Sequence, residues 1–97
     1  MDILVTHGPP EGVADVTHGR HVGDAALLRA VQALRSPPAL WVVGHIHSSY
    51  GVHRLRHVRS GRDIVVANVA THDLRDGAAT VPLVFDVLLD QTPLAGA

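Results

Sequence analysis

The sequence predicts an α/β fold in which a βαβ unit is followed by antiparallel strands, with one main helix. Two apolar runs, residues 3–5 and 40–43, flank an amphipathic segment that begins at residue 24. A strand, a helix and a second apolar strand in this order are typical of two parallel strands joined by a right-handed crossover. Two further β-rich stretches, 51–58 and 63–69, are separated by a short turn and predict a hairpin.

The first strand, over residues 2–6, ends at His7-Gly8-Pro9-Pro10, because the two prolines exclude further strand pairing. Residues 8–23 then carry four Gly and two Pro with little periodicity. A structureless connection of this length is uncommon in a small domain, and those that occur often carry function. We therefore expect a functional loop directly after His7.

The main helix is predicted from Asp24, whose carboxylate can cap the first turn. The apolar side chains that follow lie on one helical face, and the intervening arginines and glutamine lie on the other. Ser36-Pro37-Pro38 ends the helix, because a residue before proline avoids the helical region. The apolar positions are Leu27, Leu28, Val31 and Leu34.

The later part of the chain predicts the hairpin around Ser60-Gly61-Arg62 and a final strand over 82–89, after a connector at 76–80. We expect one domain over 1–90 and a loose tail over 91–97. Strands as uniformly apolar as 3–5 and 40–43 normally need cover on both faces of a sheet, yet one helix is predicted. Later strands that fold back, another segment or another chain would have to supply the second cover.

Composition excludes several classes of protein. The 97 residues include no Cys, so a disulfide scaffold and a thiolate zinc site are both excluded. A formal net charge of −1 argues against a nucleic-acid binder driven by bulk electrostatics. The N-terminus has neither a basic start nor a long apolar segment, so we expect no signal peptide and no membrane span. A cytoplasmic protein is the default expectation.

The sequence contains eight histidines, and three of them are candidate metal ligands. His7 and His45 each follow an apolar strand, and ligands of α/β proteins bind beyond the carboxyl ends of parallel strands. His47 would leave the same face as His45 if the extended path continues past Gly44. Neutral imidazoles suit Zn, Fe or Mn ions. Each histidine taken alone is more often a partly exposed polar residue, but the combination favours a metal site.

The other histidines carry weaker signals. His18 and His21 lie in the loop after the first strand and are candidate substrate-binding groups, although histidines are common in surface loops. His72 is similar. In the segment 53–59, alternation places Arg54 and Arg56 on one strand face, for which a solvated face is the favoured interpretation and an anion-binding rim the less favoured one.

Several motifs together resemble the C-terminal half of a calcineurin-like metallophosphoesterase domain, of the metallophosphoesterase-domain-containing subgroup. The resemblance runs through most of the chain and implies a partial β-sandwich flanked by helices. It also implies hydrolysis of phosphate mono- or diesters with two divalent ions, Mn, Fe or Zn. The motifs are His7-Gly8-Pro9-Pro10, Gly23-x-x-x-Leu27-Leu28-x-x-Val31, Val43-Gly44-His45-Ile46-His47, Tyr50-Gly51 and Asn68.

Carried over to this sequence, the resemblance assigns His7 and His45 to one metal and His47 to its neighbour. The family's N-terminal motifs, Asp-x-His, Gly-Asp-x-x-Asp and Gly-Asn-His-(Asp/Glu), are not present, and Asn68 is the only Asn. Two dications a few Å apart repel unless carboxylates offset their charge, which three neutral imidazoles do not do. We therefore expect at most one ion in this chain alone, with the N-terminal half supplied in cis or in trans, or a homo-oligomer.

The expected function is that of a truncated member of this phosphoesterase family, inactive as an isolated chain. The alternative is a non-catalytic remnant that acts as a metal-binding or protein-interaction module. A mononuclear, histidine-only hydrolase ranks lowest, because no general base with a carboxylate partner is evident. The loop acids Asp15, Asp73 and Asp76 have no spacing that recommends them, so no catalytic residue is assigned.

Overall fold

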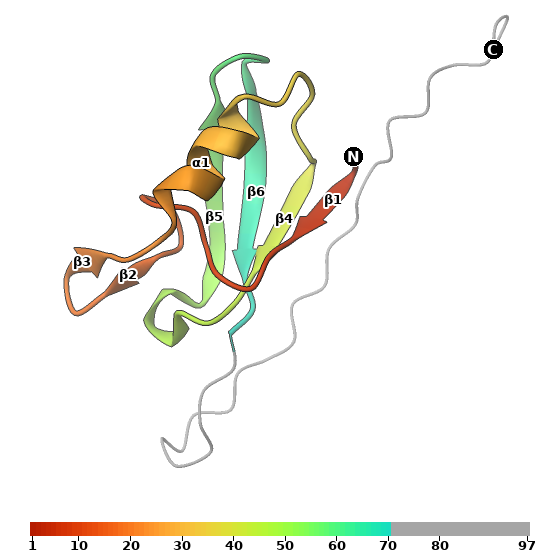
Figure 1. The fold of residues 1–97 in the computed structure, drawn as a ribbon. Coiled ribbons are helices and arrows are strands. Elements are labelled where there is room, and N and C mark those ends of the chain that lie inside the picture. The colour runs from red at the N-terminus through yellow and green to blue at the C-terminus, as the bar shows by residue number, and fades with distance from the viewer. Residues whose placement is uncertain (71–97) are drawn as a thin grey trace, which may run out of the picture.

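The predicted βαβ unit and hairpin both occur in the computed structural model, which describes residues 1–70 (Figure 1). The expected strand at 82–89, the connector, the tail, His72, Asp73 and Asp76 lie outside the described residues. In chain order the elements are β1 (Ile3–Val5), β2 (Val16–Thr17), β3 (Arg20–His21), α1 (Ala25–Gln32), β4 (Leu40–Val43), the 3-10 turn η1 (His47–Ser49), β5 (Gly51–His57) and β6 (Arg62–Asn68).

Four of these strands form one mixed sheet in the order β1-β4-β6-β5. β1 pairs with β4 in parallel, with Leu4 opposite Trp41, and β4 pairs with β6 in parallel, with Trp41 opposite Val66. β5 returns antiparallel to β6 as the outer strand of the hairpin. The carboxyl ends of β1, β4 and β6 therefore meet at one edge of the sheet (Figure 1).

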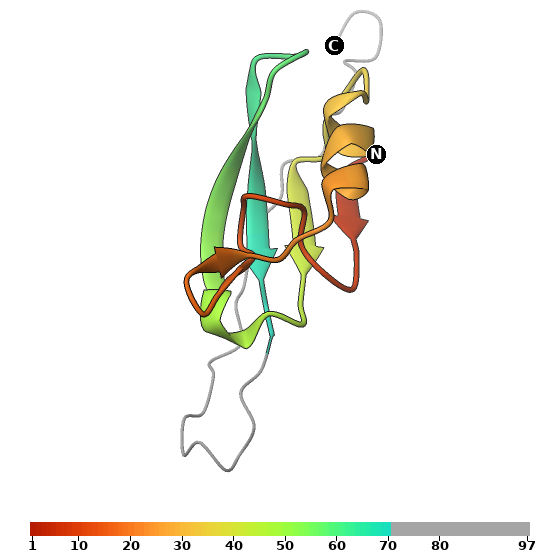
Figure 2. The ribbon, with the colours of Figure 1, turned by 60° about the vertical axis from the view of Figure 1, so that its left-hand side comes forward.

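α1 covers one face of this sheet (Figure 2). The core on that side is built from Val31 of the helix and from Trp41, Val43, Ile64 and Val66 of the strands, all buried. On the opposite face Ile3, Val5 and Val52 are 46%, 69% and 55% exposed, so none of the elements within residues 1–70 covers these apolar side chains. The α/β class with one helix is thus confirmed for residues 1–70, and the β-sandwich stays a prediction.

The loop after β1 contains more structure than its composition indicates. Residues 16–21 form a small hairpin, β2–β3, whose turn places His18 and Gly19 at φ 50° and 74°. Glycine adopts such a conformation without steric cost, and Gly19 makes the tight turn possible. Strands of two residues leave no alternating pattern, which is why the hairpin was not predicted.

The solvated face predicted for Arg54 and Arg56 is confirmed, and His57 lies on the other face of β5. Arg54 and Arg56 are exposed and lie 4.0 and 3.6 Å from carboxylate oxygens of Asp63. His57 is fully buried on that other face, with Nε2 3.1 Å from the carbonyl oxygen of Val31. Its Nδ1 accepts from the Ser60 N–H at 3.2 Å, so Nε2 carries the proton and donates to the helix. The histidine ties the hairpin to α1.

The cap of α1 gives a first testable prediction. The Asp24 carboxylate accepts the Leu27 N–H at 3.0 Å, which satisfies a donor that otherwise has no partner inside the helix. Asp24→Ala is expected to lower the free energy of unfolding by about 1 kcal/mol in urea titrations. Asp24→Asn, which retains a capping oxygen, should unfold close to the wild type, and equal losses in the two variants would contradict the capping role.

Candidate functional site

His7 and His45 lie together at the carboxyl edge of the sheet, as their positions after β1 and β4 predict. Their ring centroids are 4.9 Å apart, and the ring planes are inclined by 37°. The backbone fixes this approach, because the Gly44 N–H donates to the His7 carbonyl at 3.0 Å. Both side chains are exposed, so a ligand can reach the pair from solvent.

Hydrogen bonds of Thr6 stabilise the turn that contains His7. Its N–H continues the β1–β4 ladder to the Val42 carbonyl at 3.0 Å. Its hydroxyl donates to the Gly8 carbonyl at 2.8 Å and accepts from the indole Nε1 of Trp41 at 2.9 Å. The imidazole therefore follows a residue that is anchored to the sheet and to the core.

His47 does not share a strand face with His45, so the assumption of an extended path past Gly44 is wrong. β4 ends at Val43, His45 adopts a left-handed backbone with φ 71°, and His47 begins η1. Among residues 1–70 no three His, Cys, Asp or Glu side chains gather as a potential metal-ligand group. The joint role of His7, His45 and His47 as metal ligands stays a prediction.

A cavity of about 450 Å³ opens beside the histidine pair. Its wall includes the Asp24 carboxyl residue at the start of α1, together with Val22 and Leu27. The site thus combines two imidazoles, one acidic residue and an apolar wall, a composition typical of small-molecule sites. The described residues that line the cavity are Thr6, His7, Gly8, Pro9, Val22, Asp24, Leu27, His45 and Ile46.

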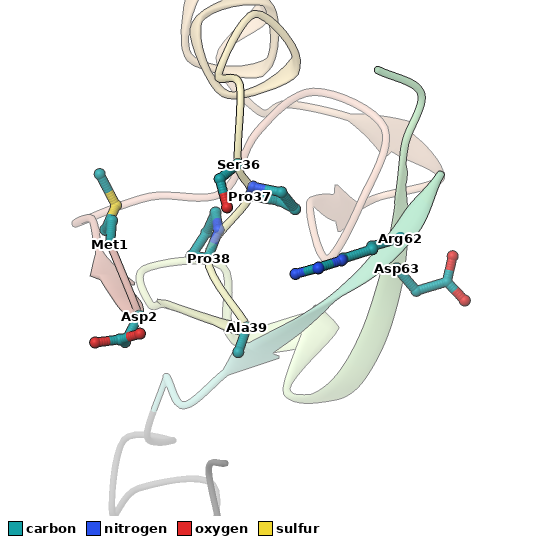
Figure 3. Close-up of a pocket in the computed structure, with 8 residues that line it drawn as sticks. All are labelled: Met1, Asp2, Ser36, Pro37, Pro38, Ala39, Arg62 and Asp63. Carbon is teal, nitrogen blue, oxygen red and sulfur yellow. The ribbon is translucent and has the colours of Figure 1, made fainter. Parts of the chain in front are cut away.

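A second cavity, of about 370 Å³, lies around Met1, Pro38 and Arg62, at the edge of the sheet opposite the histidines (Figure 3). The Arg62 side chain extends across it toward the prolines, and Asp63 points away (Figure 3). None of the described residues that line this cavity is a histidine. The paired imidazoles are therefore found at the carboxyl edge, on the other side of the sheet from Arg62.

The loop after β1 also contains an ion pair that spacing alone did not indicate. Asp15 is fully buried, and its Oδ1 lies 2.7 Å from Nδ1 of His21. Its Oδ2 accepts the N–H groups of Gly12 and Gly23, both at 2.8 Å. Burial acts to raise the pKa of Asp15, but the hydrogen bonds from His21, Gly12 and Gly23 and the charge of His21 outweigh it and hold that pKa below its ordinary value of 3.8.

The structure therefore supplies the histidine with a carboxylate partner that the sequence did not reveal. Asp15 precedes His21 by six residues, a spacing that does not bring two side chains into contact within one helix or one strand. The β2–β3 hairpin brings them together. The available signal was an Asp inside a Gly-rich loop, where carboxylates often bind backbone N–H groups. His18 is exposed at the tip of the same hairpin, and the substrate-binding roles of His18 and His21 stay predictions.

The lowered pKa of Asp15 predicts a pH dependence of stability. A carboxyl group with a depressed pKa in the folded state stabilises the fold above its ordinary value of 3.8, and this contribution is lost as the pH falls through the folded-state pKa. Urea unfolding from pH 7 down to pH 2 should show a steeper loss for the wild type than for Asp15→Asn below pH 3.8. Parallel curves would contradict the assigned role of the Asp15 carboxylate.

Part of the chain is similar in sequence to proteins named for a metallophosphoesterase domain. It is 50% identical over 54 residues, 54% of this chain and 16% of the relative, to human Metallophosphoesterase domain-containing protein 1. A UPF0046 protein of Caenorhabditis elegans is 32% identical over 94 residues, 92% of this chain and 31% of that protein. Probable rhamnogalacturonate lyase C of Emericella nidulans is 46% identical over 50 residues, 52% of this chain and 4% of that protein.

The match thus spans about one sixth of the human relative. No family model matches the chain, and no solved structure matches it significantly. Within residues 1–70 no helix has the length and apolar character that crossing a membrane requires. The sequence similarity supports a metallophosphoesterase relationship for the matched part of the chain.

Proposed function

We propose that this chain supplies part of the active site of a metal-dependent phosphoesterase, with His7 and His45 as ligands of one divalent ion. The observation that carries the proposal is the contact of these two imidazoles at the carboxyl edge of the sheet. The 50% identity over 54 residues to a protein named for a metallophosphoesterase domain supports the phosphate-ester substrate class.

The geometry of the pair fits a shared cation. Two imidazoles that bind one zinc ion through nitrogens at about 2.1 Å, in a tetrahedral arrangement, have ring centroids about 5 Å apart. The observed separation of 4.9 Å is close to this distance. Zn, Mn and Fe all accept imidazole nitrogen, so the donor type does not select among them.

The described residues 1–70 supply two imidazole ligands for such an ion, and this limits what they do alone. A bound divalent ion polarises a phosphoryl oxygen and lowers the pKa of coordinated water. A second ion nearby needs carboxylates to offset the repulsion between the two charges. We therefore propose one ion per chain, with further ligands from another segment in cis, another polypeptide or a second copy, and with His47 near the neighbouring position.

A non-catalytic module is the second candidate. The observation that favours it is the lack, among the described residues, of a third metal-ligating side chain beside His7 and His45. Such a module would bind the ion without presenting it to a phosphate ester. The two candidates therefore differ in whether the bound ion is accessible to phosphate.

Phosphorus NMR of inorganic phosphate separates these functions. With Mn²⁺ and the full chain, the phosphoesterase proposal predicts that phosphate relaxation is enhanced several-fold over the same Mn²⁺ concentration in buffer. The enhancement should disappear in His7→Ala and persist in Val58→Ala, a change of an exposed side chain outside the candidate site. Tight Mn²⁺ binding without any phosphate relaxation would favour the module, and no Mn²⁺ binding would overturn both.

A further inference from the structure

Asn68 is a fully buried amide residue at the carboxyl end of β6. It does not line the histidine cavity, yet its side chain binds the backbone of the residue that follows His45. We propose that Asn68 is a positioning residue, which holds the backbone turn at His45 so that the imidazole meets that of His7. The inference rests on the proposed function, because it takes His45 to be a metal ligand.

The backbone at His45 is strained. Its φ is 71°, and the Ile46 N–H donates to the Gly44 carbonyl at 2.8 Å, two residues back in the chain. These features are those of the rarer form of the γ-turn, in which a side chain crowds its own backbone. A non-glycine residue keeps such a conformation only where the surrounding structure holds it, and such residues cluster at ligand sites. The turn at His45 therefore needs partners outside itself.

Asn68 supplies one of these partners. Its Nδ2 donates to the Ile46 carbonyl at 2.9 Å and to the Ala14 carbonyl at 3.0 Å, and its Oδ1 accepts the Ala70 N–H at 3.0 Å. Carbonyl oxygens accept and do not donate, so this orientation of the amide is the one that satisfies all three groups. Both Nδ2 protons are used, which fixes the amide against Ile46.

The turn is thus anchored on both sides of His45. On one side the Gly44 N–H donates to the His7 carbonyl at 3.0 Å, and on the other side the Ile46 carbonyl accepts from Asn68. Once both peptide groups are fixed, the direction of the Cα–Cβ bond of His45 is fixed too, and the two imidazole centroids lie 4.9 Å apart. Loss of a group that orients a metal ligand commonly weakens metal binding by about 10- to 100-fold.

The second carbonyl that Asn68 binds belongs to another residue with an unfavourable backbone. Ala14 is buried with φ 59°, and within residues 1–70 the non-glycine residues with positive φ are Ala14, His18 and His45. The same amide thus binds the carbonyl of one of them and the carbonyl that directly follows another. A side chain that only filled space would need no donors at these two points, so the pattern favours positioning over packing alone.

Zinc calorimetry with the full chain tests the role of Asn68. Asn68→Ala removes both donors and is expected to weaken Zn²⁺ binding about tenfold. Gln32→Ala is the matched control and should bind zinc as the wild type does. The Gln32 amide also binds two backbone groups, the Arg56 carbonyl and the Val58 N–H, but at the turn of the β5–β6 hairpin, the opposite end of β6 from Asn68 (Figure 1). Equal zinc affinities of Asn68→Ala and the wild type would overturn the inference.

A double-mutant cycle separates positioning from a general structural role. If Asn68 acts through His45, the loss caused by Asn68→Ala should fall to less than about twofold in the His45→Asn background. A general loosening of the sheet edge would instead weaken zinc binding by the same factor in both backgrounds, and that result would contradict positioning. Circular dichroism checks that each variant is folded at the temperature of the titration.

The wild type provides an independent measurement, which decides the outcome if Asn68→Ala does not fold. Asn68 is the only Asn of the chain, so isotope labelling of asparagine gives a single side-chain amide signal in NMR. Zinc is expected to slow hydrogen exchange of this amide, because an ion that binds the held turn stabilises it. The effect should be absent in His45→Asn, and exchange that zinc leaves unchanged in the wild type would overturn the inference.

These experiments distinguish failure of the inference from failure of the proposed function. If the wild type binds zinc and His45→Asn weakens that binding, but neither Asn68→Ala nor the exchange of the Asn68 amide shows an effect, the inference fails and the proposed function stands. If the wild type does not bind zinc, both fail.

Discussion

Replacing Trp41 by alanine is expected to lower the free energy of unfolding by about 3 to 5 kcal/mol. Trp41 is fully buried in the middle of β4, with Leu4 and Val66 as its register partners on the neighbouring strands. Its indole also donates to Thr6 Oγ1 at 2.9 Å, next to His7. Domains of this size have stabilities near the lower part of about 5–15 kcal/mol, so the variant should be largely unfolded at 37 °C.

Circular dichroism during urea titration measures this effect. Trp41→Phe keeps an aromatic ring but loses the hydrogen bond to Thr6, so it should show an intermediate loss. Val58→Ala changes an apolar side chain that is 78% exposed and should leave stability within about 0.5 kcal/mol. A Trp41→Ala protein that unfolds at the urea concentration of Val58→Ala would contradict the described core.

Removing either imidazole of the pair is expected to weaken divalent-metal binding by at least about 100-fold, because loss of an outer-shell partner alone commonly costs about 10- to 100-fold. His45 has φ 71°, and asparagine tolerates this conformation better than alanine, so His45→Asn is the cleaner variant. His7 has no such constraint and can be replaced by alanine.

Calorimetric titration with Zn²⁺ compares these variants with His18→Asn, which should bind as the wild type does. Because both imidazoles are proposed to bind one ion, His7→Ala and His45→Asn together should cost far less than the sum of the separate losses. His57 is unsuitable as a control, since its burial makes its replacement a test of folding. Additive losses with a reduced number of ions would indicate two separate sites.

Much of the sheet could be predicted because its strands carry strong local signals. β1 and β4 are continuous apolar runs bounded by proline or glycine, and α1 has both a capping residue and an apolar face. The β2–β3 hairpin depends on a turn at His18-Gly19 and on contacts with η1, 30 or so residues later in the chain. The local pattern of apolar and polar residues does not predict such long-range contacts.

The same distinction applies to the histidines. The approach of His7 and His45 follows from strand order, which the βαβ pattern predicts. The left-handed backbone at His45 changes the direction of the chain before His47, and the sequence pattern around Gly44 did not predict this conformation. The burial of His57 and the ion pair of Asp15 with His21 depend on side chains meeting across separate elements, so they became visible with the fold.

X-ray absorption spectroscopy of the zinc-loaded chain tests most directly whether His7 and His45 share a cation. The wild-type spectrum is expected to contain the multiple-scattering signal of two imidazoles, with nitrogens at about 2.0–2.1 Å from zinc. His7→Ala and His45→Asn should each retain the signal of one imidazole. A spectrum that is unchanged by either substitution would contradict the account, because the two rings would then not bind the same ion.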